Sequence, residues 1–183
     1  MAQDHMDRLA ADWARELPDL DTRAVAVIGR LERAARLLER EIEKELAQFG
    51  LTVAEFNALC ALRRAGAPYR LSPKRLGEAL LFSSGGLTKL LERLETRELV
   101  TREPDPNDGR GVLVSLTTHG KQLVEEAMHA HGINEDELLA PLSEAQREDL
   151  TEILRDLLIA FEAGVGRVRP QASRSRPIAA AAD

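Results

Sequence analysis

The stretch from Leu71 to Leu116 decides the fold of this chain, and its most informative segment is Asp105-Pro106-Asn107-Asp108-Gly109-Arg110-Gly111. Two runs rich in β-branched residues flank this segment, Leu99 to Arg102 before it and Val112 to Leu116 after it. A Pro/Asn/Asp/Gly cluster between two such runs is typical of a hairpin turn. The sequence therefore predicts a β-hairpin with Arg110 at its tip.

A helix-turn-helix pattern precedes the hairpin. Ser72-Pro73 supplies an N-cap and a first-turn proline for a helix from Lys74 to Leu80. After a break at Phe82-Ser83, a second helix is predicted from Ser84 to Arg97. Its apolar residues recur at helical spacing, namely Leu87, Leu90, Leu91 and Leu94. The opposite face is polar, as a helix that lies in the major groove of DNA requires.

A hairpin directly after a recognition helix is a wing. An exposed guanidinium at its tip, that of Arg110, is suited to a narrow minor groove with its negative potential. Asp108 is placed to accept loop amides or to orient this arginine. The pair is also compatible with an ordinary turn, but its attachment to a helix-turn-helix favours the wing.

In these residues the chain resembles the MarR-type winged-helix regulators. The resemblance rests on Ser83-Ser84-Gly85-Gly86-Leu87-Thr88, on Glu98-Leu99-Val100-Thr101-Arg102, on the hairpin segment and on Leu116-Thr117. It extends over most of the chain, from about Asp21 to Gly164. It implies a mainly α-helical fold with a small β-hairpin wing. It also implies a homodimer that binds a palindromic operator, acts as a repressor and responds to a small ligand.

The resemblance also indicates which residues contact DNA. At the major groove we expect residues of the recognition helix and its start: Ser83, Ser84, Gly85, Thr88 and Lys89. Arg93, on the same helix, is a further DNA-contact candidate. At the minor groove we expect Arg110, held in place by Asp108.

One branch of the family, the urate-responsive regulators, is similar here because it also has an added N-terminal helix with a tryptophan. In that branch an aspartate and two arginines join the tryptophan at the ligand. This chain has Trp13 and, at the base of the wing, Arg102, but Asn57 and Leu90 replace the aspartate and the other arginine. These changes remove charged contacts that an anionic purine needs, so we expect a less charged or differently shaped ligand. An alternative with equal support is that Trp13, Asn57 and Leu90 are packing residues and that the protein has no natural ligand.

The composition limits the possible classes of protein. At 183 residues the chain fits one domain, and its 3% aromatic content with abundant leucine and alanine indicates helices packed by aliphatic side chains. A single cysteine excludes an internal disulfide, and its helical pattern predicts that Cys60 is buried. Neither a secretory signal nor a membrane-spanning run is apparent, so we expect a cytoplasmic protein.

The net charge of −6 is unusual for a DNA-binding protein. The stretch from Ser72 to Val114 holds seven basic and seven acidic residues, which leaves 18 of the 25 basic and 24 of the 31 acidic residues elsewhere. A neutral recognition region supports an alternative function, a helical ligand-binding or protein-interaction dimer that keeps a winged fold without specific DNA binding. The salt dependence of binding distinguishes the two.

The remaining segments divide the chain into four parts. Residues 1–20 contain an amphipathic helix from Asp4 to Leu17; residues 21–50 and 118–164 form a helical dimerisation region; residues 51–117 form the winged helix-turn-helix; residues 165–183 form a disordered tail.

Several details of these helices are also predicted. Asp21 caps a long helix that Gly50 ends, and the acidic run that includes Glu45 lies on its solvated face. Thr52 and Ser143 open capping boxes. Tyr69 to Leu71 adds a short strand beside the wing, and the helix after Thr117 bends near Gly132.

No pattern in the chain indicates an enzyme, a cofactor or a metal site. His129 and His131 are two residues apart, so on a helix they point to different faces and do not share a metal. Phosphate-binding glycine loops, nucleophile elbows and zinc-protease motifs are absent from the sequence.

Overall fold

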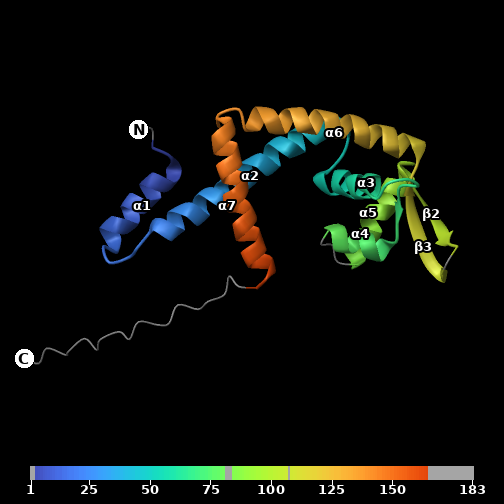
Figure 1. Cartoon of the computed structure of the whole chain (residues 1–183), viewed down its shortest axis with the longest axis horizontal. Coiled ribbons are helices and arrows are strands. Elements are labelled where there is room, and N and C mark those ends of the chain that lie inside the picture. The colour runs from blue at the N-terminus through green and yellow to red at the C-terminus, as the bar shows by residue number, and fades with distance from the viewer. Residues whose placement is uncertain (1–2, 81–83, 107, 165–183) are drawn as a thin grey trace, which may run out of the picture. The chain divides into compact units, whose positions relative to one another are not determined.

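The structure is a computed structural model that describes residues 3–80, 84–106 and 108–164 (Figure 1). Ser83, the predicted break at Phe82-Ser83 and the predicted tail lie outside these residues. The chain forms two compact units, residues 1–138 and residues 139–183, and each is described by itself.

The first unit contains six helices and three strands among the described residues. In chain order they are α1 His5–Glu16, α2 Arg23–Ala47, α3 Val53–Arg64, β1 Arg70–Leu71, α4 Pro73–Leu80, α5 Ser84–Thr96, β2 Val100–Asp105, β3 Asp108–Leu116 and α6 Thr118–Leu138. The second unit holds α7, Glu144–Glu162. This is the mainly helical fold with a small wing that the sequence predicts.

Side-chain caps fix the starts of most helices where the sequence places them. Both predicted capping boxes are present, at Thr52 for α3 and at Ser143 for α7. α2 differs from the prediction because its N-cap residue is Thr22, whose side chain makes no capping bond. The carboxylate of Asp21 instead accepts from the backbone N–H of Arg23, so it still satisfies an amide at the helix start.

Gly50 ends α2 as predicted. Its φ of +64° is left-handed, and two hydrogen bonds close the last turn, from the N–H of Leu51 to the Leu46 carbonyl and from the N–H of Gly50 to the Ala47 carbonyl. This is the Schellman arrangement, in which a residue with positive φ turns the chain out of the helix. It directs the chain into α3.

The three strands form an antiparallel sheet in the order β1-β3-β2. The short strand predicted near Tyr69 is present as β1. The hairpin strands are longer than predicted, since Asp105 pairs with Asp108 and Pro104 with Val112. Arg110 therefore lies within β3, in the irregular segment between these pairs, and not at the tip of the turn as the sequence indicated. A bulge is set by the pairing of two strands, which a single run of sequence does not reveal.

The core lies where α3, α4, α5 and α6 pack on the sheet, and the end of α2 adds Leu46 to it. Its fully buried side chains are aliphatic, and the largest are Leu46, Leu59, Leu62, Leu76, Leu90, Leu94, Leu99, Val100, Val114 and Val124. Cys60 is buried in it, as predicted, and burial raises the pKa of its thiol. This core fixes the recognition helix α5 against α3 and the base of the wing.

α6 is one unbroken helix that continues through Gly132, so the predicted disturbance there does not interrupt it. A glycine within a helix costs about 1 kcal/mol relative to alanine, and the hydrogen bonds of a 21-residue helix tolerate it. The first turn of α6 is fixed to the strand start: the Thr117 hydroxyl accepts from the Gly120 N–H at 2.9 Å and donates to the Glu98 carbonyl at 2.7 Å. A Cβ at position 120 would overlap the Leu99 carbonyl, so only glycine permits this approach.

Glu45 corrects a second prediction, because it is buried (8% exposed) and not on a solvated face. Its Oε2 atom lies 3.5 Å from Nδ1 of the buried His131 on α6. The ring of His131 also makes an edge contact with Phe56, with centroids 5.0 Å apart. The neighbouring His129 is exposed, so the two histidines face different sides of the helix, as predicted. Burial of Glu45 depends on α6, which the pattern of α2 alone does not show.

Candidate nucleic-acid interface

The recognition helix α5 is held to the body by one buried face. Leu87, Leu90, Leu91 and Leu94 are 6%, 1%, 2% and 0% exposed, so the predicted apolar stripe is confirmed. α4 contributes Leu76, which is 0% exposed, to the same core. A helix anchored along one side presents its other side in a fixed orientation.

The outward face of α5 carries the residues predicted to contact the major groove. Gly85, Thr88, Lys89 and Arg93 are exposed. Ser84 begins the helix, but its side chain lies outside the described part of the structure, as does all of Ser83. Thr88 has an interaction within the protein and Arg93 is paired with a buried carboxylate, whereas Lys89 extends positive charge from the surface.

Glu55 holds α5 in place and was missed by the sequence analysis as part of this interface. Its carboxylate is 6% exposed and lies 3.6 Å from Nε of Arg93 and 3.4 Å from Nη1 of Arg97. The same carboxylate accepts from the backbone N–H of Thr52 in the capping box of α3. One buried carboxylate thus joins the start of α3 to the last turn of α5. The only signal in the sequence was the capping box, which does not show that two arginines approach it.

The wing is joined to the recognition helix by a second ion pair. Nη2 of Arg102, on β2, lies 3.0 Å from Oε2 of Glu95, on α5. Asp108 has a partner within the protein, while the side chain of Arg110 lies outside the described part. A Cβ at Gly111 would approach Asp105 Cβ to 2.9 Å and Asp108 Cβ to 3.1 Å, so a glycine there keeps the two strands close.

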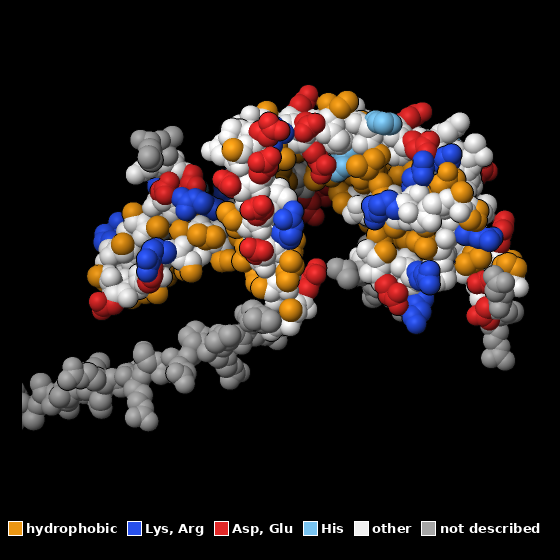
Figure 2. Space-filling view, viewed as in Figure 1, with side chains coloured by type: hydrophobic (Ala, Val, Ile, Leu, Met, Phe, Trp, Pro, Cys, Tyr) orange, Lys and Arg blue, Asp and Glu red, His pale blue; other side chains and the backbone are white. Residues whose placement is uncertain are grey.

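A second basic area lies beside the wing. Arg70 and Arg75 line a hollow of about 350 Å³ between the start of α4 and the hairpin, together with Ser72, Leu71, Asp105 and Leu113. Figure 2 shows Lys and Arg side chains on the visible face of this region with Asp and Glu side chains among them. The interface is therefore mixed in charge, as the sequence count indicates.

The four residues predicted for a ligand do not form one described cavity. Trp13 is 43% exposed on α1, which packs on α2, and Asn57 is exposed on α3. Leu90 is 1% exposed in the core below α5, and Arg102 is paired with Glu95. Leu90 can therefore influence a ligand only through packing.

Among the described residues, no group of three or more His, Cys, Asp and Glu side chains is arranged so that it could bind a metal ion. In the same part of the chain, no helix is long and apolar enough to cross a membrane. The arrangement that remains is an anchored helix with a wing beside it.

Comparison with known proteins decides which family this arrangement represents. A sequence profile of the MarR family matches residues 49–111. The chain is 36% identical to the HTH-type transcriptional regulator PecS of Dickeya dadantii over 80% of this chain and 88% of the relative. It is 32% identical to the multiple antibiotic resistance protein MarR of Salmonella typhimurium over 66% of this chain and 82% of the relative. The chain belongs to the MarR family of transcriptional regulators.

A solved MarR structure extends this likeness to a DNA complex. A mutant MarR from E. coli complexed with operator DNA shares 30% sequence identity with the chain, at a TM-score of 0.65. The match covers 80% of this chain and 97% of that one. The predicted family is thus confirmed, and the fold is that of the MarR regulators.

Proposed function

We propose that this MarR-family chain is a homodimeric repressor that binds a palindromic operator through α5 and the wing, in the cytoplasm. The observation that supports it most is the combination of a fully buried stripe on α5 with an exposed Gly85-Thr88-Lys89-Arg93 face. Burial fixes the helix, and exposure leaves its polar atoms available to base edges and phosphates.

The proposed roles differ along the interface. Ser83, Ser84 and Gly85 lie where the helix begins, so backbone N–H groups there suit phosphate oxygens. Thr88 and Lys89 follow one turn later at the major groove, where Lys89 reaches a phosphate oxygen at the edge of the groove, with Arg93 towards the DNA backbone. Arg110, oriented by Asp108, enters the minor groove.

Exposed apolar side chains support the dimer. On α2, Val27, Leu37 and Leu38 are 56%, 45% and 39% exposed. On α7, large apolar side chains are exposed in the same way, namely Ile153, Leu158, Ile159 and Phe161 at 57–60%. Several large apolar side chains exposed on one helix are typical of a surface covered by another subunit, and two-fold symmetry places two recognition helices about one turn of DNA apart.

A response to a small ligand belongs to the proposal as well. Of the four ligand residues suggested by the resemblance, three have side chains at least partly exposed to solvent, namely Trp13, Asn57 and Arg102. The fourth, Leu90, is buried and would act through the packing of the core. A ligand screen for release of DNA tests this part separately.

The test is a mobility-shift assay with the intergenic DNA upstream of the chain's own gene, at physiological salt and with competitor DNA. We expect a discrete complex in the nanomolar range that resists competitor. Arg110→Ala should weaken it by about 1–3 kcal/mol, and Arg40→Ala, on the exposed side of α2, serves as the matched control. A folded dimer that forms no specific complex would overturn the proposal in favour of a binding module without operator recognition.

A further inference from the structure

Ion pairs join α5 to the rest of the winged region on two opposite flanks. On one flank, Arg93 and Arg97 lie 3.6 and 3.4 Å from the carboxylate of Glu55 on α3. On the other flank, Glu95 lies 3.0 Å from Arg102 on β2. Because each helical residue turns the chain by about 100°, Glu95 lies about 160° around the helix axis from either arginine. The two sets of contacts therefore oppose rotation of α5 about its own axis in both directions.

Glu55 is the most buried member of these ion pairs. Its side chain is 6% exposed, whereas that of Arg93 is 59% exposed. The Oε2 atom of Glu55 also accepts from the backbone N–H of Thr52 at 2.9 Å and from the Thr52 hydroxyl at 3.0 Å, which fixes the carboxylate to the start of α3. Moving α5 away from this carboxylate would leave a buried charge without its partners, and such a change is strongly unfavourable.

The cluster of Glu55, Arg93 and Arg97 carries one negative and two positive formal charges. A guanidinium has five N–H donors, so pairing with one carboxylate leaves Arg93 with donors for a second anion. Arg93 lies one helical turn after Lys89, and both residues line a hollow of about 500 Å³ beside Glu55. The carboxylate thus holds a guanidinium in a fixed place at the flank of the proposed DNA-reading face.

Rotation of α5 matters because its outward atoms read DNA from a distance to the axis. Side chains of a helix extend about 5–6 Å from the axis, so a rotation of 10° moves their atoms by about 1 Å. Hydrogen bonds to base edges tolerate only a few tenths of an ångström. The leucine stripe of α5 is held by a non-directional force, whereas ion pairs at two flanks specify an angle. Contacts to unrelated DNA are mainly electrostatic and depend less on this angle.

We propose that Glu55 is a positioning residue for operator recognition. Its charge fixes the rotation of α5 and the guanidinium of Arg93, and it thereby determines how strongly operator DNA is preferred over unrelated DNA. The inference rests on the proposed function, because it requires that α5 binds an operator.

The experiment removes the charge of Glu55 and keeps its shape. Glutamine replaces glutamate in capping boxes, so Glu55→Gln should keep the start of α3, which circular dichroism checks. Fluorescence anisotropy at one salt concentration gives the affinity of the full-length protein for the upstream intergenic DNA and for a shuffled duplex of the same composition. We expect weaker binding to the upstream DNA and tighter binding to the shuffled duplex, so that their ratio falls about tenfold, the effect of one lost charge-assisted hydrogen bond. A merely structural role would weaken both alike and leave the ratio unchanged.

Two further variants complete the test. Glu78→Gln, at an exposed position of α4, removes the same charge outside the Glu55 cluster and should leave the ratio unchanged. Arg97→Gln removes a partner of the carboxylate at a partly exposed position and should lower the ratio. Combined with Glu55→Gln, it should lower the ratio no further, because both changes break the same interaction.

The outcomes separate this inference from the proposed function. An unchanged ratio in Glu55→Gln, or additive losses in the double variant, would overturn the positioning role while the unaltered chain still prefers the upstream DNA. An unaltered chain that binds both duplexes equally would overturn the proposed function and the positioning role together.

Discussion

At the scale of single residues, Glu98 shows how the end of the recognition helix is built. Its φ is +55°, which is left-handed, and the N–H of Leu99 donates to the Leu94 carbonyl while the N–H of Glu98 donates to that of Glu95. This is the arrangement that ends α2, where Gly50 holds the corresponding position. A side chain with a Cβ pays about 1–2 kcal/mol in this conformation.

We therefore expect Glu98→Gly to raise the free energy of unfolding by about 0.5–1 kcal/mol, the relief of strain less the entropy that glycine loses. Gly50→Ala makes the opposite change at the corresponding position of α2, and it should lower the free energy of unfolding by about 1 kcal/mol. The cause is the left-handed backbone conformation and not a clash, because the new Cβ would come no closer than 3.5 Å to its neighbours. Urea denaturation followed by circular dichroism measures both. A lower stability for Glu98→Gly would mean that the carboxylate contributes more than the backbone conformation costs.

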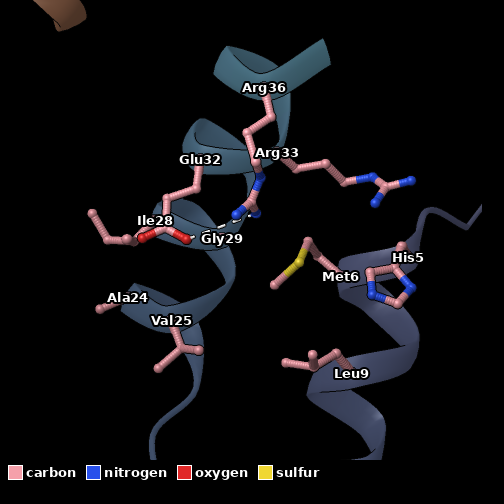
Figure 3. A pocket seen from close by; sticks show the side chains of 10 residues that line it. All are labelled: His5, Met6, Leu9, Ala24, Val25, Ile28, Gly29, Glu32, Arg33 and Arg36. Atoms are coloured by element: carbon pink, nitrogen blue, oxygen red, sulfur yellow. Dashed lines mark ion pairs between the residues drawn. The ribbon is translucent and has the colours of Figure 1, made fainter.

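At the scale of elements, α1 is attached to α2 by the buried side chain of Met6 (Figure 3) and by the ion pairs of Arg30 with Asp4 and Asp7. Most of α1 is exposed, and Met6 is its only buried residue. The carboxyl of Asp4 accepts from the backbone N–H of Asp7 and pairs with Arg30, and these interactions lower the pKa of Asp4 below its ordinary value. A carboxyl group whose pKa is lowered by folding stabilises the attached helix at pH values above its pKa in the unfolded chain. This stabilisation is lost as the pH falls through its pKa in the folded chain.

Acid should therefore loosen α1 while the core remains folded. As the pH falls from about 5 to about 2, we expect Trp13 emission to change before the far-ultraviolet circular dichroism of the whole chain. Asp4→Asn should remove this early step, because its amide has no charge to lose. Asp19→Asn, an exposed change outside the Arg30 contacts, is the control. If both signals change together in the unaltered chain, the attachment of α1 does not depend on this carboxyl group.

The elements also show what sequence can and cannot predict. The stripe of α5, the capping boxes at Thr52 and Ser143 and the C-terminal glycine of α2 follow from local spacing, and each is confirmed. Glu45, Glu55 and the position of Arg110 depend on contacts between distant segments, so periodicity did not reveal their surroundings. The DNA-contact and ligand residues stay predictions.

At the scale of the whole molecule, charge is the unusual property. The net charge is −6, and the recognition region from Ser72 to Val114 is neutral. A regulator of this kind gains less from counterion release than a basic one, so shape and hydrogen bonds to bases carry more of its affinity.

This predicts a shallow salt dependence of operator binding. With about two phosphate contacts per protomer, log affinity against log salt should have a slope of about −4 for a dimer. Lys89→Gln should reduce the slope to about −2, whereas Lys44→Gln, paired with Glu41 on α2, should leave it unchanged. Fluorescence anisotropy with labelled operator DNA at several salt concentrations measures these slopes. A slope near zero would contradict phosphate contacts by Lys89.

The continuous helix α6 restricts where residues can be inserted into this chain. Its first turn is fixed to the start of β2 through Thr117 and Gly120, and Val124, Ala127 and His131 are buried further along it. Each helical residue turns the chain by about 100°, so one residue inserted between these two attachments rotates one of them out of phase. An insertion of seven residues would restore the rotation but would move the two attachments about 10 Å apart along the helix axis, so insertions there are incompatible with the fold. The connection between α6 and α7 carries no such periodic restriction, so length variation is expected to accumulate at residues 139–143 and to be excluded from residues 121–123.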